Sequence, residues 1–164
     1  MSIVFADLGG QFPWKSRLID IGGGVRQALV DEGPAEPRLT FVCLHGNPTW
    51  GFLYRAFIRA LSTEHRVLVP DHVGFGRSDK PTDLEYFTLE RHIGNLTRTL
   101  EEANARNVVV VVQDWGGPIG MGWATRHPDR VAGVVILNTW AFVRDPVMKL
   151  PWLLSSTAPS TRRW

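Results

Sequence analysis

Short apolar runs alternate with helical patterns along most of this 164-residue chain, and this alternation limits the folds that it can adopt. The runs that predict buried strands are residues 39–44, 66–70, 108–112 and 131–137. Helical patterns lie between them at residues 52–61, 89–103 and 117–126. Strands that alternate with helices indicate a mostly parallel sheet with helices on both of its faces. We therefore predict an α/β protein.

Two further strands are predicted near the start of the chain, at residues 17–21 and 25–30. Three consecutive glycines at residues 22–24 join them, which is typical of a hairpin. In α/β sheets, ligands bind beyond the carboxyl ends of the parallel strands. Two motifs occupy such ends: residues 45–48 follow the third predicted strand, and residues 113–117 follow the fifth. These two segments are the candidate functional site.

The segment Val-Gln-Asp-Trp-Gly-Gly at residues 112–117 has the layout of a nucleophile elbow, in which a strand leads through one sharp turn residue into a helix. Asp114 occupies the turn position, so we predict that it is the catalytic nucleophile. The alternative is that Asp114 caps the following helix. Ser78 is not expected to compete, because no strand leads directly into its loop, and Cys43 lies within a strand as a small buried residue.

The second motif, His-Gly-Asn-Pro-Thr-Trp at residues 45–50, leads from a strand into a helix. In this layout, the loop and the residue after the nucleophile each supply one backbone N–H to an oxyanion hole, here Asn47 and Trp115. The side chains of Asn47 and Trp115 are also N–H donors, and we expect both to point at one cavity. The alternative for Asn47 is a turn before Pro48. His45 is expected to be structural.

These two motifs resemble those of the haloalkane dehalogenases of the α/β-hydrolase fold, over roughly residues 15–150. The loop at residues 71–81 is similar to that family's connection after the fourth strand, where its role is structural. The resemblance implies that Asp114 attacks a carbon that bears a halogen and forms an alkyl ester. Asn47 and Trp115 would then bind the departing halide. The expected partners are a small halogenated aliphatic substrate, water and a halide ion, without a cofactor or a metal ion.

The resemblance also implies about eight strands, with a catalytic histidine after the last of them and an acid that orients it. Only six strands are predicted, and all five histidines precede the end of the sixth: His45, His65, His72, His92 and His127. Asn138 stands where some relatives carry the acid. We therefore expect residues 1–150 to be a partial α/β-hydrolase core, truncated after about the sixth strand, and residues 151–164 to be a disordered tail. The catalytic histidine and the orienting acid would be missing.

Two alternatives remain open. An epoxide hydrolase relative would also use an aspartate nucleophile, but it needs tyrosine acids from a cap. The chain has only Tyr54 and Tyr86, and neither follows the sixth predicted strand. The other alternative is a non-catalytic fragment without activity.

Composition restricts the location and the partners of the chain. The formal net charge is only +2 and the basic residues are dispersed, which argues against a nucleic-acid partner. Cys43 is the single cysteine, which fits a reducing compartment. The sequence starts without a basic-then-apolar leader, and its apolar runs are shorter than the roughly 20 residues of a membrane helix. We therefore expect a cytoplasmic protein without a membrane partner.

Overall fold

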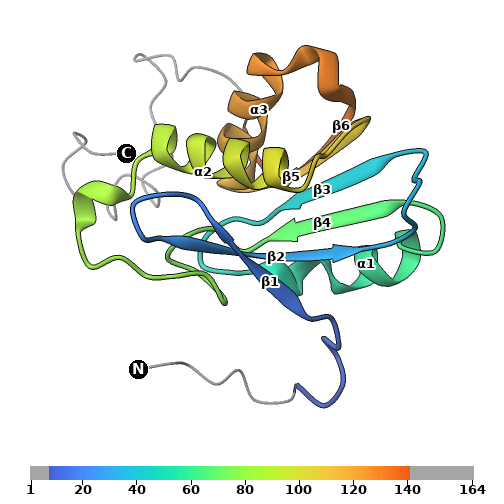
Figure 1. The fold of residues 1–164 in the computed structure, drawn as a ribbon, viewed down its shortest axis with the longest axis horizontal. Coiled ribbons are helices and arrows are strands. Elements are labelled where there is room, and N and C mark those ends of the chain that lie inside the picture. The colour runs from blue at the N-terminus through green and yellow to red at the C-terminus, as the bar shows by residue number, and fades with distance from the viewer. Residues whose placement is uncertain (1–7, 141–164) are drawn as a thin grey trace.

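The computed structural model of the chain describes residues 8–140, which form one six-stranded sheet with helices against it (Figure 1). The strands are β1 (Ser16–Asp20), β2 (Arg26–Glu32), β3 (Thr40–Leu44), β4 (Arg66–Pro70), β5 (Val108–Gln113) and β6 (Val131–Leu137). The helices are α1 (Arg55–Leu61), α2 (Leu89–Glu102) and α3 (Gly116–Arg126), with short 3-10 helices η1 (Gly51–Tyr54), η2 (Leu84–Tyr86) and η3 (Pro128–Arg130). The predicted tail, residues 151–164, and the end of the predicted core, residues 141–150, lie outside the described residues.

The order of the strands in the sheet is β1-β2-β4-β3-β5-β6. β3, β4, β5 and β6 pair in parallel, while β2 runs antiparallel to both β1 and β4. The predicted hairpin is present, with Asp20 opposite Arg26 at the turn end. The prediction of a mostly parallel sheet in an α/β protein is therefore confirmed.

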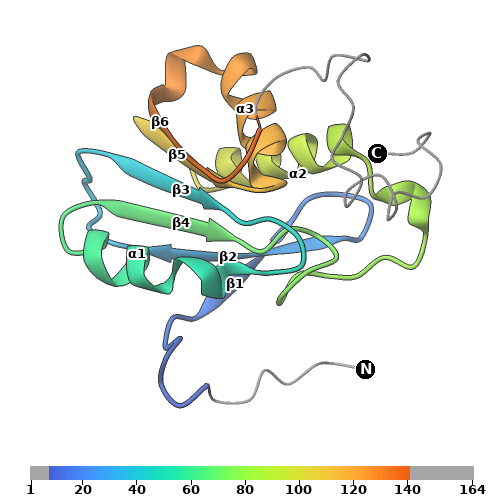
Figure 2. The ribbon, with the colours of Figure 1, turned by 180° about the vertical axis from the view of Figure 1, so that it is seen from behind.

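Helices cover both faces of the sheet, because the central strands are apolar on both sides. Figures 1 and 2 show α1 on one face and α2 with α3 on the other. In β3, the buried side chain of Cys43 packs with Tyr54 and Ile58 on the α1 face, whereas Leu44 packs with Leu96 and Trp123 on the opposite face. Such two-sided burial is what a continuous apolar strand predicts.

The two longer helices begin differently. The hydroxyl of Thr88 accepts a hydrogen bond from the N–H of Arg91 and so caps the start of α2. α3 begins without a side-chain cap, directly after the turn that follows β5. No helix within residues 8–140 is long and apolar enough to cross a membrane.

β6 pairs only with β5 in the part of the chain that the structure describes. Three of its consecutive apolar side chains are exposed, by 39% at Val134, 37% at Val135 and 56% at Ile136. An apolar strand with one unpaired edge is a template for pairing with another chain.

Candidate active site

Asp114 lies in the tight turn between the end of β5 and the start of α3. Its φ angle is +49°, in the left-handed region that residues other than glycine rarely adopt. Such a conformation costs on the order of 1–3 kcal/mol and persists where its surroundings enforce it. Here the N–H of Asp114 donates to the carbonyl of Asn138 at 3.2 Å, and its carbonyl accepts from the hydroxyl of Thr139 and from the N–H of Gly117. Both backbone groups of Asp114 are therefore held by neighbouring segments.

The glycines after Asp114 are required by close packing around the turn. A Cβ atom at Gly116 would lie 2.1 Å from the carbonyl oxygen of Leu44, at the end of β3. A Cβ atom at Gly117 would lie 1.9 Å from the hydroxyl of Thr139. The helix can approach the ends of two strands only because these residues have no side chain, which is the role of small residues in an elbow.

The two motifs identified in the sequence meet at the carboxyl edge of the sheet. Oδ1 of Asp114 accepts a hydrogen bond of 2.8 Å from the backbone N–H of Asn47. A Cβ atom at Gly46 would lie 2.3 Å from Cβ of Asp114, so the loop after β3 touches the turn directly. The carboxylate binds this loop, and α3 has no side-chain cap, so the structure does not show Asp114 as a helix cap.

A small, mostly apolar cavity with an accessible volume of about 60 Å³ lies beside this contact. Asn47 and Trp115 both line it, whereas Asp114 is not among the lining residues but contacts two of them, Gly46 and Asn47. The indole of Trp115 packs edge-on against that of Trp140, with ring centroids 5.3 Å apart. The full lining consists of Gly46, Asn47, His72, Phe75, Phe87, Thr88, Leu89, His92, Trp115 and Ile119.

Most of this lining was not predicted from the sequence, above all the two histidines. His72 follows β4 by two residues, at the same edge of the sheet as the two motifs. Because ligands bind beyond the carboxyl ends of parallel strands, this position could have identified His72 as a cavity residue. His92 lies in the first turn of α2, and Phe87 lies two residues before the start of that helix. Their proximity to Trp115 depends on how α2 packs, for which the sequence gives no signal.

The histidines near the cavity are held in the neutral form. Burial lowers the pKa of His45, against the opposing effect of its hydrogen bond to Gly46 and of the charges on Asp71 and Asp114. Burial, and then repulsion from His45 and His92, hold the pKa of His72 well below its usual value. Burial lowers the pKa of His92 to about 4. Because a general base works best with a pKa near the working pH, these three histidines are poor bases at neutral pH.

Both ring nitrogens of His45 are engaged in hydrogen bonds, as a structural histidine requires. Nδ1 lies 2.8 Å from the carbonyl oxygen of Gly46, and Nε2 accepts from the backbone N–H of His72 at 2.9 Å. Ser78 is also buried and engaged, since its hydroxyl donates to the carbonyl of Asp71 and accepts from the N–H of Ala28. Neither group is available as a nucleophile or base.

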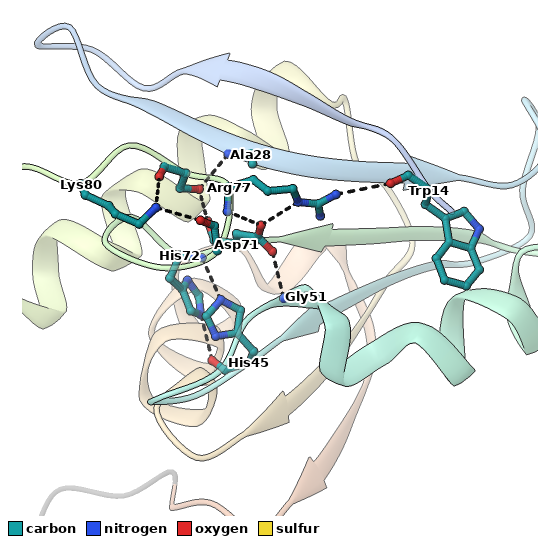
Figure 3. Close-up of polar contacts among 10 residues, drawn as sticks. Trp14, Ala28, His45, Gly51, Asp71, His72, Arg77 and Lys80 are labelled. Carbon is teal, nitrogen blue, oxygen red and sulfur yellow. Dashed lines mark hydrogen bonds and ion pairs between the residues drawn. The ribbon is translucent and has the colours of Figure 1, made fainter. Parts of the chain in front are cut away.

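The loop after β4 is built around the buried carboxylate of Asp71 (Figure 3). This carboxylate accepts hydrogen bonds from the N–H of Gly51 at 2.9 Å and from the backbone N–H and Nε of Arg77 at 2.8 and 3.1 Å. The ammonium group of Lys80 closes the loop by donating to the carbonyls of Gly76 and Ser78. These bonds give residues 71–81 the structural role that their sequence resemblance implied.

The two tyrosines lie away from the cavity, which bears on the epoxide hydrolase alternative. The hydroxyl of Tyr54 donates to the carbonyl of Leu44 in the core, and that of Tyr86 is bonded to the side chain of Asn95. Neither tyrosine lines the cavity. Residues 8–140 thus supply no tyrosine acid to it.

A mostly parallel sheet with a strand–turn–helix elbow at its carboxyl edge defines the class of α/β hydrolases. The chain belongs to this family, because the family model described as the alpha/beta hydrolase fold matches residues 40–164. The similarity to haloalkane dehalogenases is also confirmed. Haloalkane dehalogenase 1 of Mycobacterium tuberculosis is 45% identical over 131 residues, which are 77% of this chain and 44% of the relative.

Another relative has a different activity. The cis-3-alkyl-4-alkyloxetan-2-one decarboxylase of Shewanella oneidensis is 42% identical over 154 residues, which are 91% of this chain and 47% of the relative. Among solved structures, the haloalkane dehalogenase DpaA of Paraglaciecola agarilytica matches with a TM-score of 0.80 and 38% identity, over 85% of this chain and 48% of that one. The chain spans about half the length of the curated relatives it matches.

Proposed function

We propose that this chain carries the nucleophile and the halide site of a haloalkane dehalogenase-type hydrolase. A carboxylate oxygen of Asp114 bonds to the carbon that bears the halogen, and the carbon–halogen bond breaks with its electron pair leaving on the halide. The product of this step is an alkyl ester of Asp114. The observation that supports the proposal most is the left-handed turn at Asp114, which lies at the carboxyl edge of the sheet in contact with Asn47.

Asn47 and Trp115 are proposed to hold the departing halide. Their side chains carry N–H donors and both residues line the same cavity, which supports a role in stabilising the negative charge that develops as the bond breaks. The remaining wall includes Phe75, Phe87 and Ile119, whose apolar side chains suit a small halogenated aliphatic substrate. These groups require no cofactor or metal ion for the first step.

The second step, attack of water on the ester, needs a general base with an orienting acid. Of the histidines within residues 8–140, His72 and His92 line the cavity, but burial lowers the pKa of both and makes them weak bases. We therefore place the base and its acid outside the described residues. If the chain has no such base, the alkyl ester accumulates; if it also fails to form the ester, it is a non-catalytic fragment.

A second candidate function is supported by the oxetan-2-one decarboxylase, which matches 91% of this chain at 42% identity. Attack of Asp114 on the ring carbon bonded to the ring oxygen would break that carbon–oxygen bond and release a carboxylate. Loss of CO₂ would then leave its electron pair to form the alkene and would expel the carboxylate of Asp114. This sequence uses the same nucleophile, and it needs no water and no base.

The proposal includes a cytoplasmic location, as the cysteine content suggested. Cys43, the single cysteine of the chain, is buried within β3, and burial raises the pKa of its thiol. A buried, protonated thiol is inert toward oxidation and exchange.

Three substrates distinguish the candidate functions. The purified chain is incubated with 1-bromobutane, styrene oxide or a cis-3,4-dialkyloxetan-2-one, and bromide, diol and CO₂ are measured. We expect bromide from the first, and its release should be lost in the variant Asp114→Asn. Bromide release that is unchanged in this variant would contradict the proposed nucleophile. CO₂ from the lactone without bromide from bromobutane would favour the second candidate, and diol would favour the epoxide hydrolase.

A further inference from the structure

Two buried histidines, His45 directly after β3 and His72 after β4, are joined by hydrogen bonds next to the candidate site (Figure 3). Their ring centroids are 4.4 Å apart. The backbone N–H of His72 donates to Nε2 of His45 at 2.9 Å, and Nε2 of His72 lies 3.1 Å from the carbonyl oxygen of His45. The pair therefore joins two loops that are 27 residues apart in the sequence.

The neighbouring groups determine where the protons of these two rings lie. Nδ1 of His45 faces the carbonyl oxygen of Gly46, which can only accept, so Nδ1 carries the hydrogen and Nε2 is left as an acceptor for the N–H of His72. Nε2 of His72 faces the carbonyl of His45 and must likewise carry its hydrogen. A proton added to Nε2 of His45 would place two donors face to face and break the pair.

This pair lies directly next to the proposed reaction site. Gly46 and Asn47 follow His45 in the chain, and the N–H of Asn47 donates to Oδ1 of Asp114 at 2.8 Å. The loop is closely packed against Asp114, since a Cβ atom at Gly46 would lie 2.3 Å from Cβ of Asp114. A shift of the backbone at His45 must therefore change the contact between Asn47 and Asp114.

We propose that His72 is a positioning residue, whose reciprocal hydrogen bonds with His45 hold residues 45–47 against Asp114 while both imidazoles are neutral. The inference rests on the proposed function in so far as Asn47 and Asp114 form the reacting site. His72 contributes through its side chain as well as its backbone, because the donor at its Nε2 satisfies a buried carbonyl that would otherwise lose its partner.

Charged and titratable groups face the pair from several elements. His45 is influenced by Asp71 after β4 and by Asp114 after β5, which both favour its protonated form. His72 is faced by His45 and by His92 of α2, and both disfavour a charge on it. Because burial outweighs the two carboxylates at His45, its pKa is lowered, and the pair should stay intact at neutral pH.

The test compares two substitutions at one position. In His72→Gln the side-chain amide retains an N–H donor for the carbonyl of His45, whereas His72→Leu removes the donor. The control His127→Gln alters a histidine whose Nδ1 is bonded to Trp123 at the end of α3. The first readout needs no substrate: ¹⁵N chemical shifts of the imidazole of His45 give its tautomer, and hydrogen exchange at the amide of Asn47 gives the strength of its contact with Asp114.

We expect His45 in the unmodified chain to carry its hydrogen on Nδ1 at pH 7. In His72→Leu, exchange at the amide of Asn47 should be at least about tenfold faster, the effect of one lost buried hydrogen bond. His72→Gln should stay within about threefold of the unmodified chain. The second readout, the rate at which a bromoalkane alkylates Asp114, should fall in His72→Leu and recover in His72→Gln.

Several results would overturn the inference. A hydrogen on Nε2 of His45 in the unmodified chain at pH 7 is one of them, and it can be observed even if His72→Leu does not fold. Equal exchange at Asn47 in the unmodified chain and in His72→Leu is another. If the exchange and tautomer results are as expected but no variant is alkylated, the positioning role stands and the proposed function of Asp114 fails.

Discussion

Replacing two helical glycines by alanine should give opposite changes in stability, although the chemical change is the same. Gly116 is buried at the start of α3, and a Cβ atom there would lie 2.1 Å from the oxygen and 2.7 Å from the carbon of the Leu44 carbonyl. Gly94 is exposed within α2, and a Cβ atom there would meet nothing within 4 Å. The first substitution tests the close packing of the elbow, and the second is its matched control.

The expected size of each effect follows from these contacts. Gly94→Ala should stabilise the protein by roughly 0.5–1 kcal/mol, the cost of a glycine inside a helix. Overpacking usually costs about 1–3 kcal/mol, and Gly116→Ala should reach about 3 kcal/mol because the obstructing atoms are backbone, which cannot rotate away. At about 2–4 °C per kcal/mol for a chain of this size, the Tm should rise by about 1–4 °C for Gly94→Ala and fall by about 6–12 °C for Gly116→Ala.

Thermal and urea unfolding followed by circular dichroism measure both effects in the purified variants. The reasoning would be refuted if Gly116→Ala were neutral or stabilising, because Leu44 and the turn at Asp114 would then not be as closely packed as the structure shows. A loss of stability in Gly94→Ala similar to that in Gly116→Ala would also count against it, since the loss would not depend on the contacts.

Three further predictions concern pH, a buried ion pair and the edge strand. Burial lowers the pKa of His92 from 6.5 in the unfolded chain to about 4. The stability that depends on a neutral His92 is therefore complete above about pH 6.5 and is lost as the pH falls toward 4. Urea unfolding should give about 2 kcal/mol less stability at pH 5 than at pH 7.5, whereas equal stability would argue against the burial of His92. Asp71→Asn should cost about 3 kcal/mol by leaving the guanidinium of Arg77 without its buried partner. Glu90→Gln, which removes an exposed ion pair that solvent screens, should cost much less than Asp71→Asn, and equal losses in the two variants would contradict this distinction. Ile136→Lys should reduce aggregation measured by light scattering, because Ile136 is 56% exposed on β6; unchanged aggregation would point to another surface.

The fold was largely predictable because its strands are continuous apolar runs. The predicted strand at residues 131–137 has the same bounds as β6, and that at residues 108–112 differs from β5 by one residue. The predicted helix at residues 52–61 is divided into η1 and α1, a difference in backbone hydrogen bonding that apolar spacing does not reveal. The sheet order was not predicted, because it depends on contacts between strands that are far apart in the sequence.

The site was predictable where it lies in motifs and unpredictable where it depends on packing. The positions of Asp114 and Asn47 at strand ends were sufficient to predict that they meet. The sequence did not reveal that the backbone N–H of Asn47 bonds to the carboxylate of Asp114 itself. His92 was missed as a cavity residue, because only the packing of α2 brings it next to His72, whereas the position of His72 after β4 could have identified that residue.

The central claim, that Asp114 is a nucleophile, is tested most directly by the covalent intermediate. The purified chain is incubated with a reactive bromoalkane, its intact mass is measured after acid quenching, and proteolytic peptides locate the added group. We expect one alkyl group per chain on Asp114, and no addition to the variant Asp114→Asn. An alkyl group on another residue, or equal labelling of the chain and of Asp114→Asn, would contradict the account.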